Sequence, residues 1–342
     1  MNSEDELVSV IVPAFNAEQT INETLLSVRN QTHRNLDIIV VDDGSTDRTY
    51  QISSDHAQVD SRIRVIQHPN GGVAAARNRG IEEARADLIA PIDADDLWRP
   101  AKIARQLRAK RAAGDEVALV YTWSAFIDED SKVIEGEATA SFAGDVLLPL
   151  VYGNFVGNGS TALMCKSILK ELGGYDSSLR ARQAQGCEDW SLFIRIAERA
   201  HFAVVPDYLT GYRQAPNAMS RDIEQMLRSD ALVRSVTLAR HPEYLLQIKS
   251  GRRLYMDWMF RRELEDGHWS ACFKLLPGLV RREGSRFPSV RRAAKYTLRI
   301  GARILSSRPS LSLSGPQFLP LESASLEDSL IAPNEPAQSS MM

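Results

Sequence analysis

Aspartates follow two of the short apolar runs in the first hundred residues of this 342-residue chain. Asp42 and Asp43 follow one run, and Asp93, Asp95 and Asp96 follow another. The carboxyl ends of parallel strands share one edge of a sheet, so these carboxylates are expected to line one crevice. Like charges this close repel unless a cation compensates them. Mg²⁺ or Mn²⁺, which prefer oxygen ligands and also bind phosphate oxygens, would meet that need.

Each of these aspartates taken alone is also an ordinary turn or helix-cap residue, because Asp favours both positions. Their recurrence at the ends of successive strands favours a binding site. The sequence contains no G-x-G-x-x-G after the first apolar run and no G-x-x-x-x-G-K-[ST] motif. Dinucleotide-dependent dehydrogenases and P-loop enzymes are therefore both disfavoured.

Composition and charge narrow the class of protein further. The 41 basic and 44 acidic side chains give a formal net charge of −3, and 44% of residues are hydrophobic, as in ordinary globular proteins. Residues 281–305 carry a net charge of +7 on an otherwise acidic chain, so no broad nucleic-acid-binding surface is predicted. The three cysteines cannot all pair in disulfides and have no metal-ligand spacing, so a reducing compartment is favoured.

Alternating strand and helix patterns must position the aspartates. Helical patterns separate the apolar runs, and one of them predicts a helix over residues 73–84. Asn16 is predicted to cap the helix that follows the first run. Continuous apolar strands alternating with helices indicate a Rossmann-like, mostly parallel α/β sheet with helices on both faces. The predicted strands are residues 7–12, 36–41, 63–66 and 88–92.

The rest of the chain is less regular. We predict a helix over residues 98–113, a hairpin turn at residues 128–131 and mostly helical structure over residues 222–280. Residues 306–342 include 15 Ser or Pro and a single aromatic residue. Because that composition cannot bury a core, the tail is predicted to be disordered.

Three stretches carry a resemblance to a known family: VSVIVPAFNAEQTINETLLSVRNQT, DIIVVDDGSTDRT and NGGVAAARNRGIEEARADLIAPIDADDLW. Together they resemble the family 2 inverting glycosyltransferases of the GT-A fold. The resemblance implies a GT-A domain over residues 1–220, with a donor half at about 7–100 and an acceptor half at about 101–220. A helical C-terminal region over residues 221–305 and the 306–342 tail would follow.

The resemblance also implies a nucleotide-sugar donor, typically a UDP-sugar, and a divalent cation. Pro13 and Ala14 would line the nucleoside pocket, Asp42 would contact the base, and Arg77 would help to hold the nucleotide. Asp93-Ala94-Asp95 matches the metal-binding D-x-D motif, with Asp95 as the expected direct ligand. The predicted donor-binding set is Pro13, Ala14, Phe15, Asn16, Asp42, Asp43, Arg77, Asp93, Ala94 and Asp95.

Glu188-Asp189 resembles the catalytic carboxylate pair of the family. Inversion requires an acceptor hydroxyl to attack the anomeric carbon and to lose its proton, and a positioned carboxylate can accept that proton. Acidic residues are also common at helix N-termini, where they interact favourably with the helix dipole. The family context favours the catalytic role for this pair.

Two departures from family patterns qualify the prediction. The chain has no Q-x-x-R-W motif and no apolar run long enough to span a membrane, which favours a single-addition enzyme over a processive synthase. Residues 212–216 contain no histidine, so a third protein ligand for the metal stays open. Two alternatives also stay open: a sugar-nucleotide nucleotidyltransferase and a catalytically degenerate nucleotide-sugar-binding module.

The basic segment 281–305 has two readings. Basic residues recur on one helical face, with an apolar face beside them, as in helices that lie on anionic membranes. The same pattern is also found in surface helices that pack on their own domain. The acidic N-terminus does not resemble a signal peptide, so we expect a cytoplasmic protein, with peripheral contact at the inner face of the membrane through residues 281–305. The acceptor would be a glycan or a lipid-linked molecule. The basic residues on the predicted face are Arg292, Lys295, Arg299 and Arg303.

Overall fold

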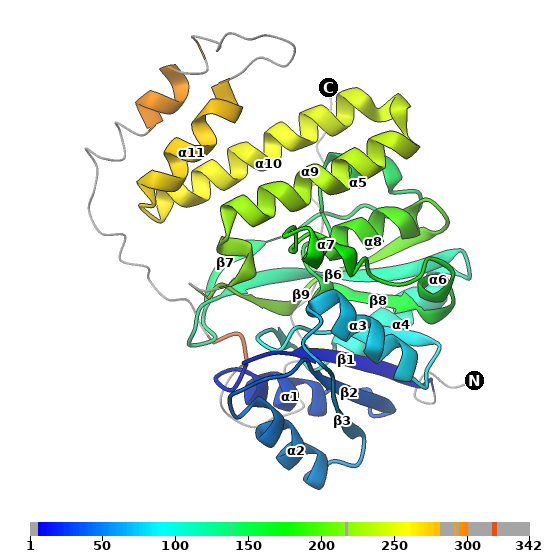
Figure 1. Ribbon diagram of the computed structural model, residues 1–342. Coiled ribbons are helices and arrows are strands. Elements are labelled where there is room, and N and C mark those ends of the chain that lie inside the picture. Colours follow the sequence, from blue (N-terminus) through cyan, green and yellow to red (C-terminus); the bar gives the residue numbers. More distant parts are fainter. Residues whose placement is uncertain are drawn as a thin grey trace, which may run out of the picture.

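The structure is a computed structural model that describes residues 6–137, 139–215, 218–280, 291, 294–299 and 317–319. Within these ranges the strands form one nine-stranded sheet in the order β3-β2-β1-β4-β8-β6-β9-β5, with β7 paired to β6. Helices cover both faces of the sheet, and the C-terminal helices form a layer at the end opposite β2 and β3 (Figure 1). The predicted α/β class is confirmed.

The donor half contains four parallel strands with a helix after each of the first three. β1 pairs in parallel with β2 and with β4, and β2 pairs in parallel with β3. The strands are β1 (Val8–Ala14), β2 (Leu36–Asp42), β3 (Ile63–Gln67) and β4 (Leu88–Pro91). The helices are α1 (Ile21–Arg29), α2 (Thr49–Val59) and α3 (Val73–Glu83). The four predicted strands and the predicted 73–84 helix are confirmed, with ends that differ by at most two residues.

Alternation along the strands explains why helices cover both faces. On β2, Ile38 and Val40 pack in the same cluster as Leu25 of α1, whereas Ile39 and Val41 pack with Ile81 of α3. Successive strand side chains point to opposite faces, so a strand buried on both sides is apolar at most positions. All seven residues of β1 and all seven of β2 are buried, and the polar Ser9 and Asp37 bond to each other at 2.8 Å.

The second half of the sheet mixes strand directions. β8 is antiparallel to both β4 and β6, β6 is parallel to β9, and β5 and β7 add antiparallel pairs to β9 and β6. The strands are β5 (Leu97–Trp98), β6 (Val117–Ile127), β7 (Val133–Glu137), β8 (Ala162–Cys165) and β9 (His201–Arg213). The helices are α4 (Lys102–Ala113), α5 (Leu147–Tyr152), α6 (Lys166–Glu171), α7 (Ser178–Ala181) and α8 (Glu188–Ala197). The predicted hairpin turn at 128–131 lies between β6 and β7.

Within residues 218–280, three α-helices follow the sheet: α9 (Ile223–Arg240), α10 (Leu245–Glu265) and α11 (Trp269–Val280). Arg234 of α9 is buried, pairs with Asp230 at 2.8 Å and donates to the Val151 and Ile248 carbonyls. One guanidinium thereby joins α5, α9 and α10. The helical prediction for residues 222–280 is confirmed. No helix within the described ranges combines the length and apolar character that crossing a bilayer requires.

Two local predictions were wrong. The predicted 98–113 helix begins only at Lys102, because Trp98 is fully buried in β5, where it pairs with Thr210 of β9. Asn16 does not cap α1, which begins at Ile21. Asn16 instead has a positive φ of 49°, and its side-chain oxygen accepts from the Thr46 amide at 2.9 Å. The Asn16 side chain therefore bonds to the loop after β2 instead of capping α1.

The last part of the chain is described only in short pieces. Most of the predicted basic segment 281–305 lies outside the described residues, but residues 294–299 are helical. There the buried Tyr296 ring packs edge-on against Phe260 of α10, with ring centroids 4.9 Å apart. The tail prediction was wrong at residues 317–319, because Phe318 is buried.

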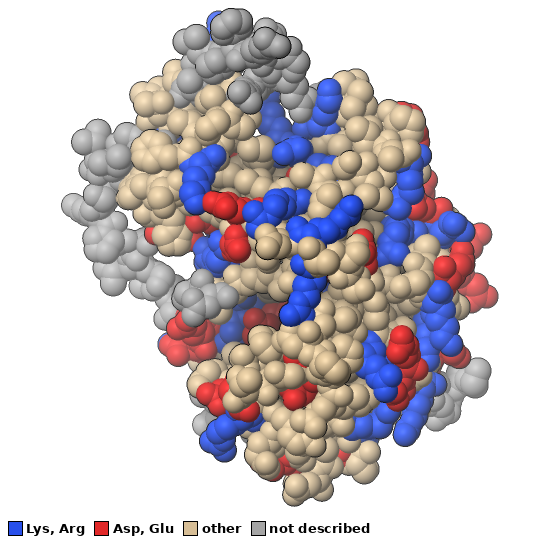
Figure 2. Space-filling view, viewed as in Figure 1, with Lys and Arg blue, Asp and Glu red and all other residues tan. Residues whose placement is uncertain are grey.

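On the face shown in Figure 2, basic and acidic side chains are interspersed.

Candidate active site

The D-x-D stretch lies in the loop between β4 and β5, at the carboxyl ends of the parallel strands. The Asp93 side chain is about one quarter exposed, at 26%. The Ala94 carbonyl accepts hydrogen bonds from the hydroxyls of Thr20 and Thr24, at 2.9 and 3.0 Å. Ala94 therefore anchors the loop to α1 through its backbone, with Asp93 and Asp95 on either side of it.

Asp96 is a structural anchor rather than part of the open site. It is fully buried and accepts hydrogen bonds from the Ser160 hydroxyl at 2.5 Å, the Asn158 amide at 3.0 Å and the Arg213 backbone N–H at 3.0 Å. Burial and then the neighbouring Asp95 raise the pKa of Asp96 well above its usual range. These bonds tie the D-x-D loop to the acceptor half.

The negative charge of the Asp95 carboxylate is disfavoured unless a positive charge lies beside it. Burial and the nearby Asp93 raise the pKa of Asp95 to about 6. Two carboxylates that disfavour each other's charge match the oxygen-donor set that Mg²⁺ or Mn²⁺ would take. Asp93 and Asp95 therefore fit the predicted metal.

Among the residues that the structure describes, no third ligating side chain is grouped with Asp93 and Asp95. In the part of the chain that the structure describes, one cluster of three side chains has metal-ligand spacing: Glu263, Asp266 and His268. That cluster lies where α10 ends. Glu263 is already bonded to Arg262 and His268, and Asp266 pairs with Arg221. The cluster has its own cationic partners and is separate from the D-x-D loop.

Arg77 on α3 connects the D-x-D loop to the predicted catalytic pair. Its guanidinium is buried and donates to Asp93 at 2.5 Å and to Asp189 at 2.6 Å. The Tyr175 ring lies under it, with the guanidinium carbon 5.1 Å from the ring centroid. Burial opposes the charge, but Asp189 and Asp93 outweigh it and raise the pKa of Arg77 well above its usual range.

Asp189 and Glu188 begin α8 but face different surroundings. Asp189 accepts from Arg77 and from the Gly159 backbone, and burial raises the pKa of Asp189 although Arg77 opposes that rise. Glu188 turns back on its own loop, where Oε2 accepts from the Gly186 N–H at 2.7 Å. Burial raises the pKa of Glu188. Of the two carboxylates, only Asp189 is joined to the D-x-D loop through a shared partner.

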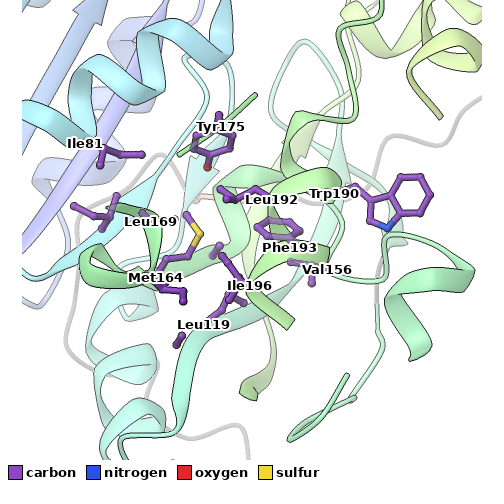
Figure 3. Packing of buried hydrophobic residues seen from close by; sticks show 14 of the residues in the cluster. Ile81, Leu119, Val156, Met164, Leu169, Tyr175, Trp190, Leu192, Phe193 and Ile196 are labelled. Carbon is purple, nitrogen blue, oxygen red and sulfur yellow. The ribbon is translucent and has the colours of Figure 1, made fainter. Parts of the chain in front are cut away.

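Packing fixes the helix that carries this pair. Leu192, Phe193 and Ile196 of α8 point into the buried cluster beside Met164 of β8 and Leu119 of β6 (Figure 3). On another side of α8, the Trp190 indole N–H donates to the Leu150 carbonyl at 2.8 Å. A helix held on two sides presents its first turn at a fixed position.

The nucleoside side of the crevice is built from the ends of β1 and β2. The Ala14 carbonyl, which follows Pro13, accepts from the Asp43 N–H at 2.8 Å. The Asp42 side chain is buried at the end of β2 and accepts from the Ser45 N–H at 3.2 Å. Phe15 is half exposed beside them. The predicted nucleoside residues are thus neighbours at one edge of the sheet.

Asp43 organises the glycine turn instead of facing the crevice. Its two oxygens accept from the Gly71 and Gly72 N–H groups at 2.8 and 2.7 Å, and His68 Nδ1 lies 3.0 Å away. The carboxylate thereby fixes the turn that precedes α3 and hence the start of the helix that carries Arg77.

Sequence reasoning missed two parts of the site. Gly159 brings its backbone against the Arg77–Asp189 pair, since a Cβ there would lie 3.1 Å from Arg77 and 3.2 Å from both Asp189 carboxylate oxygens. Arg213 is buried and donates through Nε to the Asp95 carbonyl at 2.7 Å. The Gly157–Ser160 run of turn-forming residues was a usable signal for the first part. No local signal indicated Arg213.

Comparison with known proteins gives the family that this chain resembles. Residues 9–173, a little under half of the chain, match the model of glycosyl transferase family 2. EpsH of Bacillus subtilis, which is named as a glycosyltransferase, is 39% identical over 140 residues, or 41% of this chain and 40% of EpsH. The chain therefore spans less than half the length of that relative.

Solved structures share the fold of the sheet and of the helices after it. S. aureus TarS 1–349 in complex with UDP-GlcNAc superimposes with a TM-score of 0.60 at 17% identity, over 80% of each chain. The mannosyltransferase PcManGT from Pyrobaculum calidifontis, in complex with GDP-Man and Mn²⁺, superimposes with a TM-score of 0.55 at 20% identity, over 88% of this chain and 81% of PcManGT. The GT-A fold follows from both.

Proposed function

We propose that this protein transfers one sugar from a nucleotide-diphosphate sugar, a UDP-sugar, to an acceptor hydroxyl with inversion at the anomeric carbon. The observation that carries the proposal is the position of Arg77 between Asp93 and Asp189. One guanidinium joins the loop expected to bind the donor diphosphate to the carboxylate expected to act as base. A donor carbon and an acceptor oxygen would meet beside it.

Asp93 and Asp95 are the residues that would hold a divalent cation. Such a cation supplies positive charge against the negative charge that grows on the leaving diphosphate. Arg77 donates a hydrogen bond to the Asp93 carboxylate and limits its movement. Arg213 and Ser160 hold the backbone of the same loop, the first through the Asp95 carbonyl and the second through the Asp93 N–H. The loop is thereby organised before any ligand arrives.

Asp189 would act as the general base. It would accept the proton of the acceptor hydroxyl as that oxygen attacks the face opposite the diphosphate, so no covalent enzyme intermediate is needed. Arg77 and the Gly159 backbone fix the direction of its carboxylate. Glu188 would shape the turn before α8 through its bond to Gly186, rather than exchange a proton with substrate.

The nucleoside is proposed to bind at Pro13, Ala14 and Asp42, with Phe15 and Asn16 at its border. Uridine is the proposed base because of the family resemblance and because TarS binds UDP-GlcNAc. The GDP-Man complex of PcManGT makes guanosine the comparison to test.

The acceptor is proposed to be a growing glycan or a lipid-linked sugar in polysaccharide or glycolipid synthesis. Peripheral contact of residues 281–305 with the cytoplasmic face of a membrane would bring the site near a lipid-linked acceptor. In the described part, Leu298 is 72% exposed while Tyr296 packs on α10. One side of this helix is thus held by the protein, and the other is open to a membrane.

The test is a screen of UDP- and GDP-sugars with the full chain and Mn²⁺ or Mg²⁺. Thermal shift reports binding, and release of nucleoside diphosphate reports slow hydrolysis of the donor. Proton NMR of the freed sugar, recorded before it mutarotates, reads its anomeric configuration. A β-sugar from an α-linked donor supports inversion, and an α-sugar contradicts it. Binding of every donor without hydrolysis or transfer would indicate a binding module.

A further inference from the structure

Three residues of the C-terminal tail occupy a slot at the edge of the sheet. Phe318 is 1% exposed and belongs to a buried cluster with Leu97 of β5 and with Ala125 and Ile127 of β6. We propose that this edge carries a binding site for an aromatic side chain, that residues 317–319 are its resident ligand, and that their docking holds the D-x-D loop in place.

The slot is shaped for an aromatic ring. Gly211 of β9 forms its floor, and a Cβ there would lie 2.9 Å from Phe318 Cδ1. The Arg99 guanidinium lies over the ring, 5.0 Å from the ring centroid. A flat ring beside a glycine and under a guanidinium makes both apolar and cation–π contacts. Any larger residue than glycine at 211 would close the slot.

Backbone contacts fix the tail in one register. The Phe318 N–H donates to the Ser131 carbonyl at 2.9 Å, and Gln317 forms an antiparallel bridge with Lys132. Residues 317 and 318 thus add one antiparallel bridge and one backbone hydrogen bond to the 128–132 turn. Phe318 is the single aromatic residue among the Ser- and Pro-rich residues 306–342, so no other side chain of the tail can supply an aromatic anchor.

The slot is connected to the D-x-D loop by two routes. The first route begins at Ser131, whose carbonyl accepts from Phe318. The Ser131 hydroxyl accepts a hydrogen bond from Arg213 at 2.9 Å, and Arg213 also donates to the Asp95 carbonyl at 2.7 Å. Along the chain, the slot residue Leu97 follows Asp95 by two positions. A ring withdrawn from the slot would loosen both the Arg213 contact and the start of β5.

Docking and coupling can be tested on the full chain without any ligand. Phe318→Ala empties the slot, and Phe273→Ala on α11, whose side chain is 58% exposed, is the matched control. We expect hydrogen exchange of amides in residues 93–99 and 211–213 to become about tenfold faster or more in Phe318→Ala and to stay unchanged in Phe273→Ala. Faster exchange confined to residues 131–133 would overturn the coupling. No change anywhere would overturn the docking as well.

A peptide supplied in trans provides the second test. A synthetic peptide of residues 312–322 should restore slow exchange to Phe318→Ala, whereas the same peptide with Ala at the Phe position should not. A third arm rests on the proposed function: affinity for UDP with Mn²⁺ should fall about fivefold or more in Phe318→Ala. Unchanged affinity would overturn the influence on the site. Absence of UDP binding in the wild type would count against the proposed function, and the exchange results would still decide the slot.

Discussion

The guanidinium of Arg77 donates to the Asp189 carboxylate at 2.6 Å and joins α3 to the first turn of α8. The same guanidinium donates to Asp93 at 2.5 Å. The predicted base and the predicted metal loop therefore share one buried cation. Their separation is set by the width of that side chain, and the charge balance of the crevice depends on it.

Asp189→Asn should abolish transfer while leaving donor binding nearly intact. The amide keeps the shape of the carboxylate but cannot accept a proton, and loss of a general base typically costs about 100- to 10,000-fold in rate. Turnover and donor affinity by calorimetry are measured on the same preparation. Glu188→Gln is the matched control and should keep turnover within about tenfold, because Glu188 faces Gly186. If Glu188→Gln loses more activity than Asp189→Asn, the roles are reversed.

Asp95→Ala should weaken the Mn²⁺-dependent affinity for UDP by about tenfold or more. Mutation of a residue that only hydrogen-bonds to a metal ligand already lowers metal affinity about 10- to 100-fold, and Asp95 is the expected direct ligand. Titration calorimetry with Mn²⁺, and again with excess chelator, measures the effect. Glu171→Ala is the control, since the Glu171 side chain is 55% exposed on α6. Equal UDP affinity with and without chelator would rule out the metal assignment.

Arg77→Gln should destabilise the fold by about 2–4 kcal/mol, because removal of one partner leaves buried carboxylates without compensation. Urea denaturation measures the free energy of unfolding. Arg79→Gln on the same helix, where the Arg79 side chain is 43% exposed, should change it by less than about 1 kcal/mol. The double variant Arg77→Gln/Asp189→Asn should be more stable than Arg77→Gln alone. A double variant that is less stable would argue against the pair.

His56 should make the fold less stable at mildly acidic pH. Its Nδ1 lies 3.2 Å from Arg29 Nη1 and its Nε2 lies 3.0 Å from Asn22 Oδ1, an arrangement that suits the neutral ring. Burial, and then Arg29, lower the pKa of His56. The unfolded chain therefore binds more protons just below the ordinary pKa of about 6.5, and stability falls as pH drops through that value.

Urea denaturation of wild type and His56→Gln at pH 7.5 and 5.5 measures this contribution. Wild type should lose more stability than His56→Gln between the two values, because glutamine can keep both hydrogen bonds and does not titrate. An equal loss in both proteins would show that other groups cause the pH dependence.

Residues 281–305 should bind anionic vesicles in a salt-dependent way. Arg291→Gln/Lys295→Gln in the full chain removes two exposed charges and should lower the vesicle partition coefficient about 30-fold, since each basic residue near such a surface contributes about 1 kcal/mol. Arg48→Gln/Arg108→Gln, two substitutions outside this segment, should have no effect. Co-sedimentation at low and high salt measures both variants. Equal pelleting with neutral and anionic lipid would assign this segment to packing on its own domain.

Local sequence patterns determined the donor half of the protein. Apolar runs such as 36–41 become strands buried on both faces because only such strands can lie between two layers of helices. Asp42, Asp93 and Asp95 then lie at one edge because parallel strands present their carboxyl ends together. Periodicity and strand direction are local properties, and for this reason the sequence alone predicted them.

Tertiary structure decided which of these residues act on one another. Arg77 and Asp189 are 112 positions apart, and Arg213 follows the Asp95 whose carbonyl it binds by 118. The Arg213 contact exists because β5, which follows the D-x-D loop, pairs with β9, and no local pattern encodes that pairing. The same holds for Phe318, whose tail has the composition of a disordered segment. Its burial depends on a slot made by strands far away in the sequence, because favourable packing of one ring there outweighs a local preference for disorder.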